Sequence, residues 1–382
     1  MSLLLKAYCA FSPLAQAVIK PFCDPRRYKF SFPPKKFWIH FASVGEFTAT
    51  ASLINHLPPG QVLLTCTSQN GLKAVPPKFQ TYLLPLDSAS LMSKALKEIN
   101  PKLLIFIESE FWPNLWRLTK AAGVPYILVN VTIKTQPLLR LKLNLKKDFF
   151  KSAERIYAQD PKSFEILSQF NKNCYLLGNL KAIQQRSVDE AFRNSIKKLK
   201  NEYPKVITWS SFRVEELNSL KLICELLNSS LQDTALIIAP RYLETVAQIK
   251  TFLESLNVAS RVYPGEMGKV TILNKFGLVT TAVAESILFL VGGTFCDGLA
   301  GHSPFEGVQF NTAAVMGWGG YSVEKYRDFV FRINSKKELE KALISFIRNP
   351  AERKKVAAKM ANYASQVRES SEELLRFLDT YV

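Results

Sequence analysis

The sequence predicts an α/β protein with two doubly wound, Rossmann-like domains, and three observations support this fold class. The 382 residues exceed what one hydrophobic core usually serves, because single domains rarely grow beyond about 250 residues. Short apolar runs alternate with helical patterns in each half of the chain, as in βαβ units. A polar, charged stretch separates the halves. Ligands of such sheets bind beyond the carboxyl ends of the strands, so we expect the domains to face each other across a central cleft.

Residues 1–36 are predicted to form an apolar and basic segment that associates with a membrane. Residues 2–22 are mostly apolar, but Lys6, Pro13 and Lys20 interrupt them. A transmembrane helix needs about 20 apolar residues in succession, and no small-residue cleavage site indicates a signal peptide. An amphipathic surface helix with a basic collar fits better. The basic residues of that collar are Arg26, Arg27, Lys29, Lys35 and Lys36.

Residues 37–182 are predicted to form the first domain. Its apolar runs are FWIHFA, VLLTC, TYLLP, LLIFIE and YILVN, each separated from the next by a loop or a helical pattern. Continuous apolar runs of this kind suit parallel strands that are buried on both faces. The alternation fades near residue 180.

Residues 183–382 are predicted to form the second domain, with the link between the two domains at about residues 181–187. A charged helical stretch comes first, and then the strand-like runs KVITW, TALIIAP, KVTIL, ILFLVGG and TAAVMG. Residues 336–380 carry Lys, Glu and Leu at helical spacing and are expected to close the domain as helices.

The net charge of +18, from 50 Lys and Arg against 32 Asp and Glu, requires an anionic partner or surface. Nucleic acid, an anionic membrane and a phosphorylated substrate all meet this requirement. No zinc finger, RNA-binding aromatic pair or basic repeat supports nucleic acid, so none is expected as a partner. The six cysteines contain no C-x-x-C pair, which favours reduced thiols over a metal site or a disulfide framework.

The first candidate site motif is Ser43-Val44-Gly45-Glu46, which follows a predicted strand and opens a helix. Gly45 would allow a tight turn or the close approach of a ligand. Glu46 would project from a helix N-terminus, where a carboxylate can act as a general base. The same residues also fit a capping box, in which Ser43 and Glu46 satisfy the first N–H groups of the helix. The four residues fit both interpretations equally well.

The second motif places Glu108 and Glu110 at the end of another apolar strand, shortly before Trp112. Two carboxylates beside a tryptophan are unusual at a strand terminus. One of them could orient a substrate or stabilise positive charge that develops on it. In a purely structural role, one carboxylate would cap a helix, and Trp112 and Trp116 would belong to the core.

The third motif, Gly178-Asn179-Leu180-Lys181, ends the last strand of the first domain. Lys181 could balance the charge of a phosphate or carboxylate, or it could be an ordinary surface lysine.

The second half of the chain carries loops typical of a nucleotide and phosphate site. Arg241 follows Pro240 at a strand end and offers a rigid fork of donors. Gly292-Gly293 follows the run ILFLV, and glycine-rich loops bring backbone N–H groups to an anion. The stretch from His302 to Glu306 comes close behind. No G-x-x-x-x-G-K motif of a P-loop is present.

Together these segments resemble the Kdo transferase family. Its members are GT-B glycosyltransferases that move 3-deoxy-D-manno-octulosonic acid (Kdo) from CMP-Kdo to a lipid A precursor at the inner membrane. Five motifs occur in the order of that family, each at a strand end, and they cover nearly the whole chain. They are SVGE at 43–46, ESEFWPNL at 108–115, the stretch from AQD to GNLK at 158–181, IIAPR at 237–241, and FLVGGTF to GHSPFE at 289–306.

The resemblance implies that the first domain binds the acceptor and the second binds CMP-Kdo. Glu46 would deprotonate the acceptor hydroxyl, Glu108 or Glu110 would assist the transition state, and Lys181 would help to stabilise it. The residues implied at the donor site are Ser210, Ser211, Pro240, Arg241, Lys275, Phe276, Gly277, Gly293, His302, Ser303 and Glu306. The family is inverting and needs neither a metal nor a cofactor, which agrees with the lack of an Asp-x-Asp motif here.

Several positions depart from the family pattern. Leu278 and Ser303 stand where the family usually has Glu and Asn, and Phe212 and Val214 stand where it has His and Gly. The arginine usual shortly after Asn130 is missing as well. These departures indicate a divergent member, with a changed acceptor or a changed number of transferred sugars as alternatives.

The resemblance also accounts for the charge, since the donor, the lipid acceptor and the surrounding lipid are all anionic. It implies a location at the cytoplasmic face of the inner membrane, peripheral or anchored by the N-terminus. Residues 138–151 interleave leucines with basic residues, which predicts either a helix against the lipid or a solvated helix with its leucines in the core.

Two other functions compete with this one. The chain could be another GT-B enzyme that uses a UDP-sugar, which donor preference would reveal. It could also be a homologue that binds lipid without catalysis, although the chain keeps Glu46, Lys181, Arg241 and Glu306.

Overall fold

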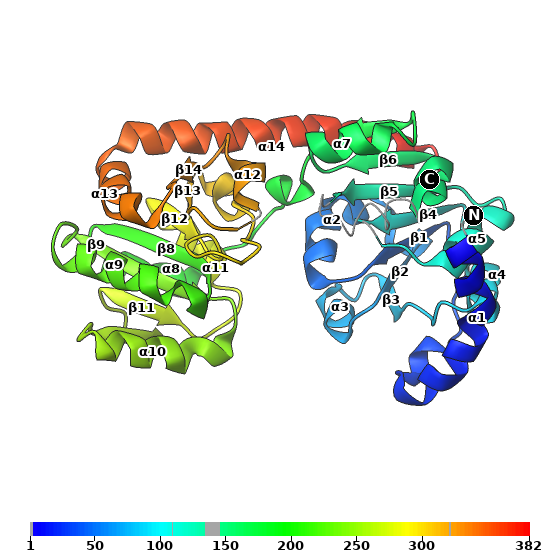
Figure 1. Cartoon of the computed structure of the whole chain (residues 1–382), viewed down its shortest axis with the longest axis horizontal. Helices are drawn as coiled ribbons and strands as arrows, with labels where there is room; N and C mark the ends of the chain where they lie inside the picture. The colour runs from blue at the N-terminus through cyan, green and yellow to red at the C-terminus, as the bar shows by residue number, and fades with distance from the viewer. Residues whose placement is uncertain (1–2, 109, 134–145, 321) are drawn as a thin grey trace. The chain divides into compact units, whose positions relative to one another are not determined.

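Two parallel sheets of seven strands form the framework of the computed structural model, which describes residues 3–108, 110–133, 146–320 and 322–382 (Figure 1). The chain divides into two compact units. Unit 1 holds residues 1–184 and 366–382, and unit 2 holds residues 185–365. The predicted class of two doubly wound α/β domains is therefore confirmed.

The sheet of unit 1 has the order β3-β2-β1-β4-β5-β6-β7. Its strands are β1 (Phe37–Phe41), β2 (Val62–Cys66), β3 (Gln80–Leu83), β4 (Leu103–Ile107), β5 (Tyr126–Val131), β6 (Arg155–Ala158) and β7 (Cys174–Leu176). Strands β1, β2 and β4 are buried along their whole length, as the continuous apolar runs predict. β1 pairs with β4, with Phe37 opposite Leu103, although β2 and β3 lie between them in the chain. The strand order therefore reverses between β1 and β4.

Helices cover both faces of this sheet. They are α1 (Leu3–Ile19), α2 (Val44–His56), α3 (Gln69–Ala74), α4 (Ala89–Ile99), α5 (Pro113–Ala121) and α7 (Pro161–Ser168), with the short 3-10 helices η1 (Lys20–Phe22), η2 (Pro25–Arg27), η3 (Pro59–Gln61) and η4 (Leu180–Ile183). α4 packs on α5 and α1, whereas α2 packs on α3 and η4. Figure 1 shows these two groups on opposite sides of the sheet.

Local sequence sets where these helices begin. Ser43, Ser68 and Ser88 are the N-caps of α2, α3 and α4, and each side chain accepts a hydrogen bond from the backbone N–H three residues on. Residues 146–152 are also helical. The basic helix predicted at 138–151 falls mostly outside the described residues.

The sheet of unit 2 has the order β10-β11-β9-β8-β12-β13-β14. Its strands are β8 (Lys205–Phe212), β9 (Thr234–Pro240), β10 (Ser260–Tyr263), β11 (Val270–Leu273), β12 (Leu288–Val291), β13 (Ala313–Met316) and β14 (Phe331–Arg332). β8 pairs with both β9 and β12. In this unit the strand order reverses between β8 and β12.

The helices of unit 2 pack against two hydrophobic clusters, one containing Trp209 and the other containing Phe192. They are α8 (Glu190–Leu199), α9 (Leu217–Asn228), α10 (Val246–Ser255), α11 (Val279–Ala284), α12 (Ser322–Tyr326) and α13 (Leu339–Arg348), with η5 (Val214–Glu216), η6 (Leu243–Thr245), η7 (Phe305–Phe310) and η8 (Lys336–Glu338). The last helix, α14 (Pro350–Asp379), begins in unit 2 and ends in unit 1.

The end of α14 differs from the sequence expectation, which assigns all of residues 183–382 to the second domain. Its 30 residues make a helix of about 45 Å, longer than a small domain is wide. The final turns are bound to unit 1. Glu373 pairs with Arg155 at 3.1 Å, Asp379 contacts His56 at 2.7 Å, and Leu378 is fully buried.

α1 is tied to unit 1 by one face only. The Tyr8 hydroxyl donates to Asp87 at 3.1 Å, and Asn114 Nδ2 donates to the Ser12 hydroxyl at 3.1 Å. The opposite side exposes apolar side chains at helical spacing. No helix among the described residues is both long and apolar enough to cross a membrane.

Candidate active site

The loops after β1 and β4 lie beside each other at the point where the strand order of unit 1 reverses. Ligands of doubly wound sheets bind at this switch point, beyond the carboxyl ends of the strands. The loop after β1 leads into α2 and carries Glu46, and the loop after β4 carries Glu108 and Glu110. The structure thus brings three of the four predicted catalytic residues to one edge of one sheet.

Glu46 lies in the first turn of α2, and its carboxylate turns back toward the start of the helix. The Ala42 backbone N–H donates to Oε2 at 2.6 Å, and the Ser43 hydroxyl donates to Oε1 at 3.3 Å. Ser43 also accepts from the Glu46 N–H at 3.3 Å. The capping arrangement is therefore present, and it fixes the carboxylate in one orientation, so the capping and catalytic interpretations are compatible.

Gly45 is not needed to relieve a clash in this turn. A Cβ atom there would meet only the Ser43 hydroxyl, at 3.8 Å, which is an ordinary contact. The residue is exposed beside Glu46.

The environment of Glu46 shifts the pKa of its carboxyl group upward. Burial raises its pKa to about 7, and the negative charges of Glu108 and Glu110 add to this effect against the hydrogen bonds from Ala42 and Ser43. A base works best when its pKa lies near the operating pH. A strongly shifted carboxyl at a switch point is also typical of a functional site.

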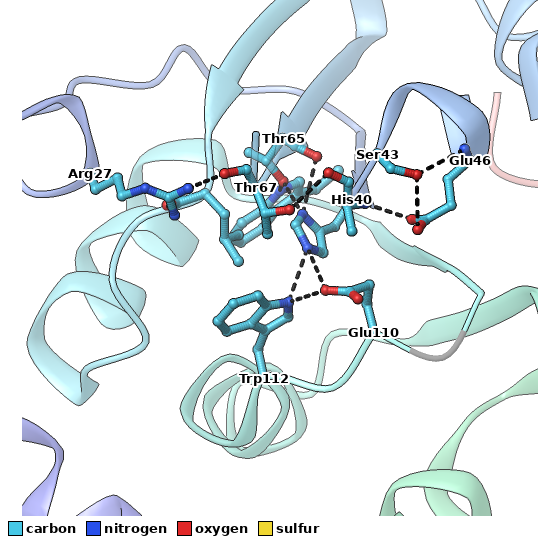
Figure 2. A network of polar contacts seen from close by, with 11 residues as sticks. Arg27, His40, Ser43, Glu46, Thr65, Thr67, Glu110 and Trp112 are labelled. Atoms are coloured by element: carbon cyan, nitrogen blue, oxygen red, sulfur yellow. Dashed lines mark hydrogen bonds and ion pairs between the residues drawn. The ribbon is translucent and has the colours of Figure 1, made fainter. Parts of the chain in front are cut away.

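Glu110 belongs to a partly buried hydrogen-bond network that the sequence pattern does not predict (Figure 2). Trp112 Nε1 lies 3.1 Å from Glu110 Oε2 and 3.0 Å from His40 Nε2. His40 is fully buried near the end of β1, and its Nδ1 lies 3.1 Å from the Thr65 carbonyl oxygen. The network therefore connects β1, β2 and the loop after β4.

The charge of Glu110 is favoured by its neighbours. Burial alone would raise its pKa, but the polar contacts of this network, among them the hydrogen bond from Trp112, and the positive charge of Lys146 outweigh burial and hold the pKa below its ordinary value. Glu110 is thus ionised at neutral pH, and its negative charge helps to raise the pKa of Glu46.

Glu110→Gln is expected to shift the pH dependence of activity. Removing the negative charge near Glu46 removes a repulsion, so the pKa of Glu46 falls and the base stays ionised at lower pH. The acid limb of the kcat/KM profile should move to lower pH by several tenths of a unit or more, whatever the change in maximal rate. Activity measured across a buffer series tests this. A limb that stays in place or moves to higher pH would contradict the coupling.

Lys181 lies in η4, which packs on α2, the helix that carries Glu46. Asn179 caps η4 by accepting from the Lys181 N–H at 3.0 Å, and Asn130 Oδ1 accepts from the Leu180 N–H at 3.4 Å. Asn130 itself is fully buried, and its backbone has a left-handed conformation with φ of 63°. The fourth predicted catalytic residue therefore belongs to unit 1 with the other three.

The eleven residues predicted for the donor site all lie in unit 2, and most follow the carboxyl ends of its strands. Ser210 and Ser211 lie near the end of β8, Pro240 ends β9 and Arg241 follows it. Because these strands are parallel, their carboxyl ends share one edge of the sheet. The second switch point therefore carries the predicted donor residues.

The glycine loop after β12 lies directly against the end of β8. The Gly292 N–H donates to the Ser210 carbonyl at 2.8 Å. A Cβ atom at Gly292 would lie 2.1 Å from the Ser211 carbonyl oxygen, so only glycine fits this position. Ser211 has a left-handed backbone conformation, with φ of 52°, where its carbonyl group approaches Gly292.

A buried carboxylate holds this loop in place. Glu216 Oε1 accepts from the N–H groups of Thr294 at 3.1 Å and Phe295 at 3.0 Å. Its Oε2 accepts from the Arg213 N–H at 3.0 Å. Glu216 is fully buried, and burial raises its pKa despite these bonds. The sequence pattern does not predict a structural role for Glu216, because two adjacent glutamates before a helix usually lie in solvent.

The remaining donor residues surround the same edge. Arg241 is exposed, and its guanidinium lies 5.9 Å from the centre of the Tyr242 ring. The turn Lys275-Phe276-Gly277 follows β11. Phe276 is 74% exposed, and the φ of 86° at Gly277 requires glycine. Lys275 Nζ lies 3.8 Å from Asp189.

His302, Ser303 and Glu306 follow the glycine loop. The His302 N–H donates to the Gly292 carbonyl at 3.2 Å, which joins the two segments. Glu306 lies in the first turn of η7, and its Oε2 is buried without a hydrogen-bond partner in the structure. Gly293, His302 and Ser303 therefore lie close together in the chain fold.

Two departures from the family pattern have a structural reason. Leu278 is buried with Phe192 and Ala282, so this side chain is part of the hydrophobic core. Phe212 packs edge-on against Trp209, with ring centres 4.8 Å apart. Nothing in the structure explains the serine at position 303. Among the described residues, no three His, Cys, Asp or Glu side chains are grouped to hold a metal ion.

Two doubly wound units with polar loops at both switch points have the architecture of the GT-B fold. A family model described as 3-deoxy-D-manno-octulosonic-acid transferase matches residues 23–184. The transferase of that name from Aquifex aeolicus is 26% identical over 299 residues, which cover 77% of this chain and 79% of that one. The transferase from Rickettsia typhi is 27% identical over 307 residues, 75% of this chain and 65% of that one.

The chain is thus similar to Kdo transferases over about three quarters of its length. In fold it is also similar to the UDP-N-acetylglucosamine 2-epimerase of Neisseria meningitidis bound to UDP-GlcNAc. The TM-score is 0.60 at 12% identity, and the match covers 88% of this chain and 99% of that one. This second likeness concerns the fold alone, because unrelated activities share such folds.

Proposed function

We propose that the protein transfers Kdo from CMP-Kdo to the lipid A precursor lipid IVA in lipopolysaccharide synthesis, with inversion at the sugar carbon. The observation that carries this proposal is the carboxylate of Glu46. It is fixed by Ala42 and Ser43 at a switch point, and its pKa of about 7 suits a base at neutral pH. The similarity to Kdo transferases supports the choice of donor and acceptor.

In the proposed reaction Glu46 accepts the proton of the acceptor hydroxyl. The freed oxygen forms a bond to the sugar carbon while the bond from that carbon to the CMP phosphate breaks, and the electron pair leaves with CMP. The sugar carbon gains positive charge during this exchange. The ionised Glu110, with Glu108 beside it, stabilises that charge, and Lys181 balances negative charge on the donor.

The donor is proposed to bind unit 2 at the glycine loop and the residues around it. Backbone N–H groups of a glycine-rich loop and the guanidinium of Arg241 suit a phosphate. The buried Oε2 of Glu306 has no hydrogen-bond partner in the structure. A buried acceptor without a donor is costly, and hydroxyl groups of a bound nucleotide would remove that cost.

A transfer assay tests the proposal. Native protein is incubated with lipid IVA and CMP-Kdo generated in situ, and in parallel with UDP-N-acetylglucosamine, and the lipid product is analysed by mass spectrometry. We expect a mass increase of one or more Kdo residues with matching CMP release, and no product from the UDP-sugar. Transfer from the UDP-sugar alone, or neither product nor CMP, would overturn the proposal.

We further propose that α1 attaches the protein to the anionic inner membrane at its cytoplasmic face. Phe11, Leu14 and Val18 follow each other at helical spacing and are 64%, 66% and 70% exposed, and Phe22 beyond the helix is 89% exposed. Basic residues of the segment 20–29 follow directly. An apolar stripe beside basic side chains suits the interface of an anionic bilayer.

Replacing Phe11, Leu14, Val18 and Phe22 together with Ser is expected to weaken binding to vesicles that contain anionic lipid by at least about a hundredfold. Each large apolar side chain contributes roughly 1.5 kcal/mol or more when buried. Co-sedimentation with vesicles measures the change. The matched control is Leu176→Ser, which alters an exposed leucine on β7 and should bind like native protein. Equal binding by all three proteins would contradict the proposed attachment.

A further inference from the structure

The indole of Trp112 lies between two groups that can both accept its single N–H. Its Nε1 is 3.0 Å from His40 Nε2 and 3.1 Å from Glu110 Oε2. The two acceptor atoms are 3.7 Å apart, which is too long for a direct hydrogen bond. Figure 2 shows the imidazole, the indole and the carboxylate converging on this point. The indole N–H is therefore shared.

The partners of His40 fix which of its nitrogens carries the proton. Nδ1 lies 3.1 Å from the Thr65 backbone carbonyl oxygen, which can only accept. Nδ1 must therefore be the donor, and Nε2 of the neutral ring presents a lone pair to Trp112. The Thr65 hydroxyl also lies 3.1 Å from Nδ1. It accepts a hydrogen bond from Trp38 Nε1 at 2.9 Å, and this bond joins β1 to β2 beside the imidazole ring of His40.

We propose that His40 is a positioning residue for the transfer reaction, which holds the Trp112 indole so that its N–H reaches the carboxylate of Glu110. The inference rests on the proposed function, because it assigns Glu110 a role at the reacting sugar. Burying a histidine in a strand costs free energy of folding unless both of its ring nitrogens form hydrogen bonds. An apolar side chain would fill the same space at a lower cost in free energy. The network instead fixes a carboxylate at the switch point.

Two substitutions test the roles of the two ring nitrogens of His40 separately. In His40→Asn the amide nitrogen takes the place of Nδ1 and keeps the bond to Thr65, but nothing replaces Nε2. In His40→Gln the longer amide reaches the place of Nε2. We expect His40→Asn to lower kcat about tenfold, the effect of one hydrogen bond to a charged group. The KM values for both substrates should change little, and His40→Gln should recover most of the rate.

A double-mutant cycle tests whether His40 acts through Trp112. Trp112→Phe should lower kcat about as much as His40→Asn, and the double variant should lose no more than either single variant. His56→Asn is the matched control, since His56 is exposed and bound to Asp379. It should keep the native rate. Losses that multiply in the double variant, or a native kcat in His40→Asn, would overturn the proposal.

An NMR measurement that does not depend on catalytic activity tests this inference separately from the proposed function. The chain has five tryptophans, and the indole resonance missing from the nitrogen-15 spectrum of Trp112→Phe belongs to Trp112. That resonance should shift in His40→Asn and in Glu110→Gln and stay in place in His56→Asn. If native protein transfers no Kdo but the resonance shifts as expected, the proposed function fails while the shared bond stands. An unmoved resonance overturns the inference by itself.

Discussion

Glu46→Gln is expected to lower kcat for Kdo transfer by roughly a thousandfold, within the range that general base catalysis supplies. Glutamine has the size of glutamate, and its carbonyl oxygen can still accept from the Ala42 N–H, which lies 2.6 Å from the carboxylate. It cannot accept the proton of the acceptor hydroxyl. Initial rates of lipid product formation at saturating donor and acceptor measure the loss.

Two controls separate this effect from damage to the fold. Glu190→Gln changes another glutamate in the first turn of a helix, α8, and should keep the native rate. The melting temperature of Glu46→Gln near pH 8 should not fall. Burial raises the pKa of Glu46, so its ionised form above that pKa is disfavoured in the folded protein, and glutamine removes this cost. CMP binding should also persist, since its proposed residues lie in unit 2. A kcat within about tenfold of native would show that Glu46 is not the base.

Glu216→Ala is expected to have the second largest effect, on the stability of unit 2 and on donor binding. The substitution leaves the N–H groups of Arg213, Thr294 and Phe295 without their acceptor in a fully buried site. Each buried N–H without a partner costs about 1–3 kcal/mol, so a loss of about 3 kcal/mol or more is expected. Urea unfolding measures the stability, and calorimetry should find CMP binding weakened at least about tenfold.

Glu215→Ala provides the matched control for Glu216→Ala. Glu215 is the preceding residue, its side chain is 44% exposed, and its ion pair with Arg213 at 2.9 Å lies at the surface. Exposed pairs of this kind contribute roughly 0–1 kcal/mol. If both alanine variants lose similar stability and similar CMP affinity, Glu216 does not hold the donor loop.

The fold could be predicted from the sequence because strands buried on both faces leave a continuous apolar signal. The runs FWIHFA and LLIFIE are β1 and β4 almost residue for residue. The site motifs could be placed for a related reason. Parallel strands bring their carboxyl ends to one edge, so Glu46 and Glu110 are predicted to share an edge although 64 positions separate them in the printed sequence.

The sequence does not reveal contacts that depend on packing between distant segments. His40 lies inside an apolar strand run and has the pattern of an ordinary core residue, since its partners Thr65 and Trp112 come from other parts of the chain. Glu216 has the pattern of a solvated charge, because the N–H groups that it binds belong to a loop nearly eighty residues away. α14 has helical spacing throughout, and only its contacts with Arg155 and His56 show where it ends.

The pH dependence of kcat/KM for the native protein tests the central claim most directly, because this ratio reports the ionisation of the free enzyme. With Glu46 as the base, transfer should rise with pH and reach half its maximum near the pKa of that carboxyl, about 7. A rate that is constant between about pH 5 and pH 8, or one that rises as the pH falls, would contradict the assignment of Glu46 as the base.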